Sequence, residues 1–329
     1  MYIERLDRMF RNVGHAAPRV GSGIAAAALL WLSPSIAHEA RAVDWDKAKE
    51  KQVTLFYPGQ SSWEWVMTAK DHSGATKFRE GKNCKGCHEG EQKAIGETIV
   101  KGKKLEPNPP AGKPGALTLK VATMRDDERL YFRFRWTGTT GGAKLDPRHA
   151  ARVTVMLDDG SIKEATRAGC WSSCHDDLAG MASAKGGELT KYLAASRTKI
   201  TRSGGGESYK PAAALAQMLK AGNVLEYWQA RLNPGKPAQG IGGYILEKRH
   251  EVSNSGVTAE ATQKGNEWTV ILSRPLKATR PGQKNLVPGK TYSVGFAVHD
   301  NHANHRFHHV SLEQTLALDK GTADFVAAR

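Results

Sequence analysis

The chain has only four cysteines among its 329 residues, few aromatic side chains (7%) and a single apolar run of any length, near its N-terminus. So few cysteines exclude a small domain held together by many disulfides. One short apolar run excludes a membrane protein with several spans. Acidic residues are also outnumbered by basic ones, which gives a formal charge of +15. With 40% apolar residues the chain can build a core, so its composition is not that of a disordered protein.

The first 37 residues have the three parts of an export signal. Basic residues precede the apolar run 20–32, and Ser35-Ile36-Ala37 then provides the small side chains of a cleavage site. A membrane anchor is the alternative, but such a run is short for a hydrocarbon core of about 30 Å. We predict a signal peptide over residues 1–37, cleaved near Ala37 or Ala42, and a periplasmic location.

The first cysteine pair belongs to the sequence C-x-x-C-H, which attaches haem c. Cys84 and Cys87 are spaced so that each thiol can form a thioether to one porphyrin, and His88 follows as proximal iron ligand. Half of a zinc site, a redox dithiol and a disulfide are the alternatives. Zinc requires two further ligands at matched spacing, and a redox motif requires a βαβ context that the sequence lacks. We therefore predict haem at this motif.

The second pair has one more residue between its cysteines. Cys170, Cys174 and His175 form C-x-x-x-C-H. One interpretation is a disulfide beside an unrelated histidine, although a loop this short is often strained. The other is a widened haem-attachment site with His175 as proximal ligand. We favour the second, which uses all four cysteines and predicts two haem c groups.

A low-spin haem also needs a distal ligand, usually His or Met. His72, twelve residues before Cys84, is our candidate for the first haem, because the segment between them could fold back over the haem face. His308 is our candidate for the second haem, because it opens a strand-like run. Four neighbouring histidines are alternative ligands: His299, His302, His305 and His309. A solvent-facing loop or an adventitious metal site is the other interpretation of this His-rich segment.

Alternating apolar and polar residues predict strands after residue 115. These runs are 117–123, 130–136, 153–157, 268–272, 292–298 and 310–318, and one helix is expected at 212–220. Because no βαβ rhythm is present, the pattern favours an antiparallel sandwich. We predict a mainly β fold in which residues 111–329 form a haem-binding β-sandwich with the second haem. Residues 38–110 then form a small, partly helical c-type haem segment, followed by the Pro-rich stretch 107–114.

Several segments resemble the haem-binding family typified by the γ subunit of ethylbenzene dehydrogenase and related dimethyl-sulfoxide-reductase-type enzymes. They are RDDERLYFRFRWTG, VTVMLDDG, GCWSSCHDD, EYWQARLNPG and GFAVHDNHANHRFHHVSLEQTLAL, within residues 115–320. The resemblance implies a β-sandwich that encloses one haem, which in that family is a non-covalent haem b with Met and Lys ligands. This chain differs in having Cys170, Cys174 and His175. It also has His308 about where the family's Lys is expected, which suggests bis-His ligation.

Two such haems indicate outer-sphere electron transfer, in which iron changes oxidation state while its ligands stay fixed. We predict a periplasmic dihaem c-type cytochrome that carries electrons between partners, more an electron carrier than a catalyst. The alternatives are a haem-bearing electron-transfer subunit of a larger, molybdoenzyme-like oxidoreductase, and a haem enzyme with an open iron site.

Basic residues surround the first motif and predict a redox partner with an acidic docking face. They are Lys77, Arg79, Lys82, Lys85, Lys93, Lys101, Lys103 and Lys104. A membrane-associated quinol dehydrogenase or oxidoreductase complex is a further candidate partner. Nucleic acid is not expected, because the chain carries an export signal and lacks interleaved basic and aromatic motifs.

Overall fold

Thirteen of the described strands form one sheet. The structure, a computed structural model, describes residues 43–61, 63–103, 105–106, 108–142, 144–169, 175–176, 190–191, 193–198 and 209–329. The sheet contains β1 (Lys51–Phe56), β2 (Ala116–Arg125), β3 (Arg129–Thr137), β4 (Ala151–Asp158), β7 (Leu225–Leu232), β8 (Gln239–Ile245), β9 (Arg249–Val252), β10 (Thr258–Lys264), β11 (Glu267–Pro275), β12 (Thr291–His299), β13 (His309–Val310), β14 (Gln314–Leu318) and β15 (Phe325–Ala327). Strands β5 (His175–Asp176) and β6 (Thr190–Lys191) pair separately.

The sheet folds over on itself as a sandwich. Its strand order is β10-β11-β3-β2-β1-β13-β12-β4-β7-β8-β9, and β14 and β15 extend it from β12. Phe132 of β3 nevertheless meets Trp228 of β7, with 5.7 Å between ring centroids, and Phe296 of β12 at 6.1 Å. Strands so far apart in the order can make these contacts only across a core between two layers. The predicted mainly β sandwich is confirmed, and its pairs are antiparallel except β14 with β15.

Burial along the strands shows which face of each layer is covered. In β3 the buried residues alternate with more exposed ones, which is the pattern of a strand with one face in the core. In β4 every residue is buried. Val155 faces the sandwich core, while the neighbouring Met156 belongs to a second apolar cluster on the opposite face. Other parts of the chain therefore cover the outer face of β4.

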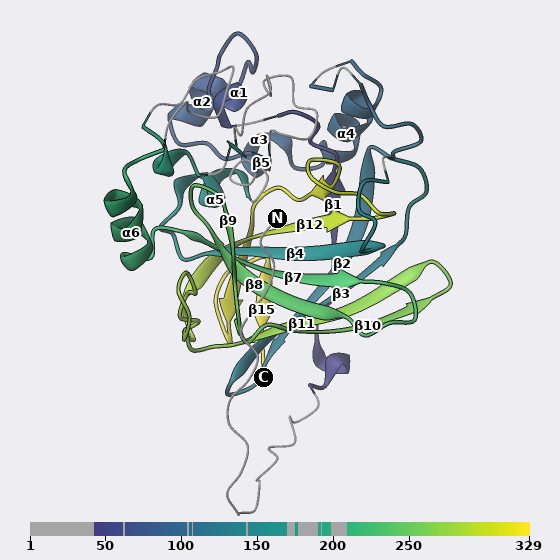
Figure 1. Ribbon diagram of the computed structural model, residues 1–329, viewed down its shortest axis with the longest axis vertical. Coiled ribbons are helices and arrows are strands. Elements are labelled where there is room, and N and C mark those ends of the chain that lie inside the picture. Colours follow the sequence, from purple (N-terminus) through teal and green to yellow (C-terminus); the bar gives the residue numbers. More distant parts are fainter. Residues whose placement is uncertain are drawn as a thin grey trace, which may run out of the picture. The chain divides into compact units, whose positions relative to one another are not determined.

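That cover is built mainly from short helices. They are α1 (Trp63–Val66), α2 (Ala75–Arg79), α3 (Lys85–His88), α4 (Gln92–Val100) and α5 (Lys163–Ala168), and the chain also forms α6 (Ala212–Lys220) and the 3-10 turns Trp45–Lys47 and Ala194–Ser196. In Figure 1, α1, α2, α3 and α5 lie together on the side of β12 that is away from β10 and β11. Trp63, Phe78 and Cys84 join Met156 in the second cluster. The first cysteine motif thus lies over the sandwich.

The expected strands and the helix at 212–220 are confirmed, except that one strand is interrupted; β1, β7, β8 and β10 are among the strands that were not predicted. The predicted strand 310–318 is interrupted, since β13 ends at Val310 and β14 begins at Gln314. Strand β1, which was not predicted, lies between β2 and β13. The predicted haem segment 38–110 therefore contributes a strand to the sheet.

Candidate functional site

The first attachment motif forms a single helical turn. Asn83 Oδ1 accepts the Gly86 N–H at 2.9 Å, which starts the turn, and the Cys84 carbonyl accepts the His88 N–H at 2.8 Å. Cys84 is buried, with 7% of its surface exposed, whereas Cys87 is exposed. Both are free thiols. One turn of helix α3 thus presents both sulfurs and His88, as the motif predicts.

The structure brings His72 to His88. Their ring centroids are 6.1 Å apart with 41° between the ring planes. A metal ion bound by one nitrogen of each imidazole would make two bonds of about 2 Å. When the distance from each nitrogen to its ring centre is added, the total comes close to the observed separation of the ring centroids. A single metal ion between the rings therefore fits the spacing.

Both imidazoles are oriented through the same ring nitrogen. His88 Nδ1 lies 2.8 Å from Glu91 Oε2, and His72 Nδ1 lies 3.1 Å from the Val66 carbonyl oxygen. Trp65 packs on His72 with 5.3 Å between ring centroids. Partners of this kind fix the tautomer and aim Nε2 at a metal. Glu91 follows His88 by three residues, so the helical spacing in the sequence is the signal that could have identified it.

Two distant segments hold the backbone of the first motif. The Cys84 N–H donates to the Arg167 carbonyl at 2.8 Å, and the Lys85 N–H donates to Glu313 Oε1 at 2.7 Å. Gly169 packs against the main chain of Glu313, since a Cβ added to Gly169 would lie 2.9 Å from the Glu313 nitrogen. We call these five residues the attachment junction. Sequence reasoning missed Arg167 and Glu313, because nothing local links them to residue 84.

Charge at the attachment junction argues against a redox dithiol. Glu313 is 5% exposed, and burial raises its pKa to about 7, although the hydrogen bond from Lys85 acts to lower it. Burial, followed by the negative charge of Glu313, raises the pKa of the Cys84 thiol. A redox-active cysteine requires a lowered pKa. The environment of Cys84 instead suits a cysteine used for attachment.

A cavity of about 760 Å³ opens beside Cys87. It is lined by Lys77, Glu80, Gly81, Lys82, Gly86 and Cys87. Two lysines of the predicted basic surface therefore border the exposed sulfur. Lys85 belongs to the same basic set but binds Asp324 at 2.5 Å.

Less of the second motif can be placed. Cys170 and Cys174 lie outside the described residues, and His175 is described only as the first residue of β5, paired with Lys191. Helix α5 ends at Ala168, two residues before Cys170. Attachment at this motif stays a prediction.

The predicted distal ligand His308 is nearly buried, at 8% exposure. Its Nδ1 lies 2.9 Å from the His305 carbonyl, and its ring stacks on His299 with 4.6 Å between centroids. Burial lowers the pKa of His308 to about 4. The ring is then neutral at physiological pH, which is the form that binds metals.

The other candidates in the segment have structural partners. His302 Nδ1 lies 2.9 Å from the Asp146 carbonyl, and His309 Nε2 lies 2.8 Å from the Pro114 carbonyl. His299 Nε2 lies 2.9 Å from the His305 carbonyl, and burial lowers its pKa well below the usual value. Within the part of the chain that the structure describes, no group of three His, Cys, Asp or Glu side chains could hold a metal ion. His308 and His309 are both buried, so these two side chains do not face solvent.

Comparisons with known proteins agree with the chemistry of these donors. Residues 236–311 match the family model for ethylbenzene dehydrogenase. Cytochrome c-552 of Stutzerimonas stutzeri is 35% identical over 294 residues, covering 88% of this chain and 92% of the relative. Cytochrome c-551 of Rhodocyclus tenuis is 28% identical over 298 residues, covering 88% of this chain and 100% of the relative. A family 9 carbohydrate-binding module from Caldicellulosiruptor kristjanssonii, solved with glucose, is 11% identical with a TM-score of 0.26, covering 60% of this chain and 66% of its own.

A β-sandwich with an ethylbenzene dehydrogenase-like domain and a C-x-x-C-H turn defines a c-type cytochrome, an electron carrier with haem c iron. The chain belongs to the family that includes cytochrome c-552 of Stutzerimonas stutzeri. The free thiols of Cys84 and Cys87 and the paired imidazoles of His72 and His88 fit that cofactor. None of the described helices is both long enough and apolar enough to cross a bilayer.

Proposed function

We propose that this protein is a periplasmic dihaem cytochrome that carries electrons between redox partners. The observation that carries the proposal is the imidazole pair His72 and His88, 6.1 Å apart beside two free thiols. Haem iron supplies a one-electron couple. His72 and His88 would both bind the haem iron and leave no ligand position open for a substrate, which favours electron transfer.

The chain's own residues would orient the two imidazoles and influence the redox potential of the iron. Glu91 and the Val66 carbonyl hold the two imidazoles in one orientation, so little rearrangement accompanies a change of charge. Trp65 packs against His72, with 5.3 Å between ring centroids. Two histidines place the potential below that of a His/Met pair, because Met ligation raises it.

For the second haem we propose attachment to Cys170 and Cys174, with His175 and His308 as axial ligands. The burial of His308 and its neutral imidazole support this choice. His299 stacks on the same ring and restricts its rotation.

We expect the purified, export-processed chain to carry two covalent haems. Denaturing electrophoresis with haem staining should give a stained band, and the intact mass should exceed that of the polypeptide by two haems. Changing Cys170 and Cys174 together to alanine should remove one haem, while the matched change of Cys84 and Cys87 removes the other. A mass equal to one haem with Cys170 and Cys174 bridged as a disulfide would overturn the dihaem proposal.

Replacing His308 with alanine should make one haem high-spin and leave the other low-spin. The reason is that a haem with His175 alone has an open sixth position. Electronic absorption of the oxidised and reduced protein measures this, with His302→Ala as the control from the same segment. An unchanged spectrum for His308→Ala would exclude His308 as a ligand.

Export is proposed from the pattern of residues 1–37, which lie outside the described residues. It suits a protein with covalently attached haem. The two lysines at the cavity beside Cys87 support docking of an acidic redox partner there. A membrane-associated quinol dehydrogenase or oxidoreductase complex is a candidate for that partner.

One observation favours a second function. Residues 236–311 match the ethylbenzene dehydrogenase family model, so the chain could serve as the haem-bearing subunit of a larger oxidoreductase. Stoichiometric purification with a catalytic subunit would favour this function, and a stable lone chain with two low-spin haems would favour the carrier.

A further inference from the structure

Glu313 is a buried carboxylate that electron transfer by itself does not require. It lies in the chain between β13 and β14, and it is 5% exposed. One of its oxygens, Oε1, accepts the Lys85 N–H at 2.7 Å. The other, Oε2, is buried and has no hydrogen-bond partner among the residues that the structure describes. Buried polar groups are normally hydrogen-bonded, so the charged form of Glu313 is only half satisfied.

The charged groups near Glu313 are engaged with other partners. The ammonium group of Lys85 binds Asp324 Oδ1 at 2.5 Å. Asp324 acts on Glu313 as a second negative charge, which favours the protonated form of Glu313. Arg167 of α5 directs its guanidinium to the Lys82 carbonyl, with 2.8 Å from Nη2 to the oxygen. Burial is therefore the main influence on Glu313, and it raises the pKa of this carboxyl to about 7.

Glu313 lies against the helical turn that carries the first attachment motif. Its hydrogen bond goes to the residue after Cys84, and His88 ends the same turn three residues later. Burial, and then the negative charge of Glu313, raise the pKa of the Cys84 thiol, so this charge acts at the Cys84 sulfur. In the haem-loaded protein that sulfur becomes the thioether at the porphyrin edge. Because Glu313 is shielded from water, its charge acts more strongly than an exposed charge would.

We propose that Glu313 is a proton-binding site coupled to the haem at Cys84 and Cys87, so that the protein takes up a proton when this haem is reduced and releases it on oxidation. One electron from the redox partner converts ferric to ferrous iron. One proton from water binds Glu313 and converts its carboxylate to a carboxylic acid. The inference rests on the proposed attachment of haem at the first motif and does not involve the second.

The coupling has a definite sign. Reduction adds one negative charge near Glu313, which raises the affinity of Glu313 for a proton. Because linkage between two binding events is reciprocal, a proton on Glu313 raises the potential of the haem by the same free energy. The potential is therefore expected to fall as the pH rises through about 7, where Glu313 loses its proton.

The test is proton uptake by the full, haem-loaded chain during reduction at an electrode. A pH-indicator dye in weakly buffered solution measures the protons bound per electron, and wild-type uptake should be greatest near neutral pH. Glu313→Gln should lose most of this uptake, since glutamine can still accept the Lys85 N–H but cannot bind the proton. The reduced-minus-oxidised infrared spectrum of the wild type should gain a carboxylic acid carbonyl band, which Glu313→Gln should lack.

Glu89→Gln is the matched control. Glu89 also lies near Lys85, with 3.8 Å between Oε1 and Nζ, but its side chain is 69% exposed. Water and salt screen its charge, so proton uptake in this variant should equal that of the wild type.

Three results would overturn the inference, and they are distinguishable. A haem-loaded wild type without proton uptake near neutral pH would overturn the coupling and leave electron transfer intact. Unchanged uptake in Glu313→Gln would overturn the assignment to Glu313. Absence of covalent haem from Cys84 and Cys87 in the mature chain would overturn the proposed function together with this inference.

Discussion

Replacing His72 with alanine is expected to convert the first haem from a low-spin to a high-spin form. The haem would remain attached through Cys84 and Cys87, and His88 would remain its proximal ligand. The sixth position would then be open, because His72 is the imidazole that faces His88 at 6.1 Å. Absorption spectroscopy in both oxidation states, together with binding of an added small ligand such as cyanide, measures the change.

Two further variants make this test specific. Added imidazole should restore the low-spin spectrum of His72→Ala, since it replaces the lost side chain. His72→Met should give a low-spin haem with a raised potential, because Met ligation favours the reduced iron. His250 is the control, since its ring stacks on Tyr244 and its Nε2 lies 2.9 Å from Glu247 Oε1. If His72→Ala keeps the wild-type spectrum, the distal ligand of the first haem is another residue.

Local patterns predicted the strands whose side chains alternate clearly. Strands β2, β3, β11 and β12 were found because large apolar residues occupy every second position. Strand β8 was not found, because its sequence QGIGGYI has little β propensity. Its glycines are needed for close approach, as a Cβ on Gly243 would overlap the His250 carbonyl oxygen. Strand β10 was missed because alanine and threonine give it no strong apolar face.

The residues of the candidate site also fall into those that a local sequence pattern identifies and those that it does not. Cys84, Cys87 and His88 could be identified because their spacing lies within one helical turn. His72 could be named because only a short segment separates it from the motif. Arg167 and Glu313 could not be identified from the sequence. Arg167 is 85 residues from its partner Lys82, and Glu313 is 228 residues from its partner Lys85, so only folding brings them to the motif. A charged residue that bonds to a distant backbone leaves no periodic signal in the sequence.

The buried pair Glu226 and Arg274 should produce the largest loss of stability on substitution. Their side chains are 1% and 0% exposed, and Glu226 Oε1 lies 2.8 Å from Arg274 Nε. Glu226 also accepts the Trp228 indole N–H and the Lys284 main-chain N–H, both at 2.7 Å. Burial raises the pKa of Glu226 and lowers that of Arg274, while their mutual attraction opposes both shifts.

Glu226→Gln should therefore lower the free energy of unfolding by about 3 to 5 kcal/mol, because it leaves a buried guanidinium without its counter-charge. Denaturant unfolding of the haem-loaded chain, followed by circular dichroism, measures the loss. Glu251→Gln is the matched control, since its bond to Arg231 is at the surface and such pairs contribute about 1 kcal/mol or less. A loss below 1 kcal/mol for Glu226→Gln would contradict the expectation.

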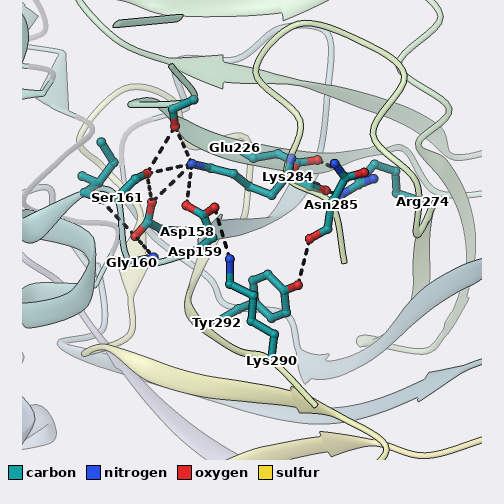
Figure 2. Close-up of polar contacts among 12 residues, drawn as sticks. Asp158, Asp159, Gly160, Ser161, Glu226, Arg274, Lys284, Asn285, Lys290 and Tyr292 are labelled. Carbon is teal, nitrogen blue, oxygen red and sulfur yellow. Dashed lines mark hydrogen bonds and ion pairs between the residues drawn. The ribbon is translucent and has the colours of Figure 1, made fainter. Parts of the chain in front are cut away.

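The double variant Glu226→Leu with Arg274→Met tests whether the loss of stability comes from leaving one charge unpaired. Removing both charges leaves no unpaired ion in the core, so this protein should be more stable than Glu226→Gln alone. Lys284 links the pair to the start of α5, because its backbone N–H donates to Glu226 while its ammonium group donates to Ser161 (Figure 2).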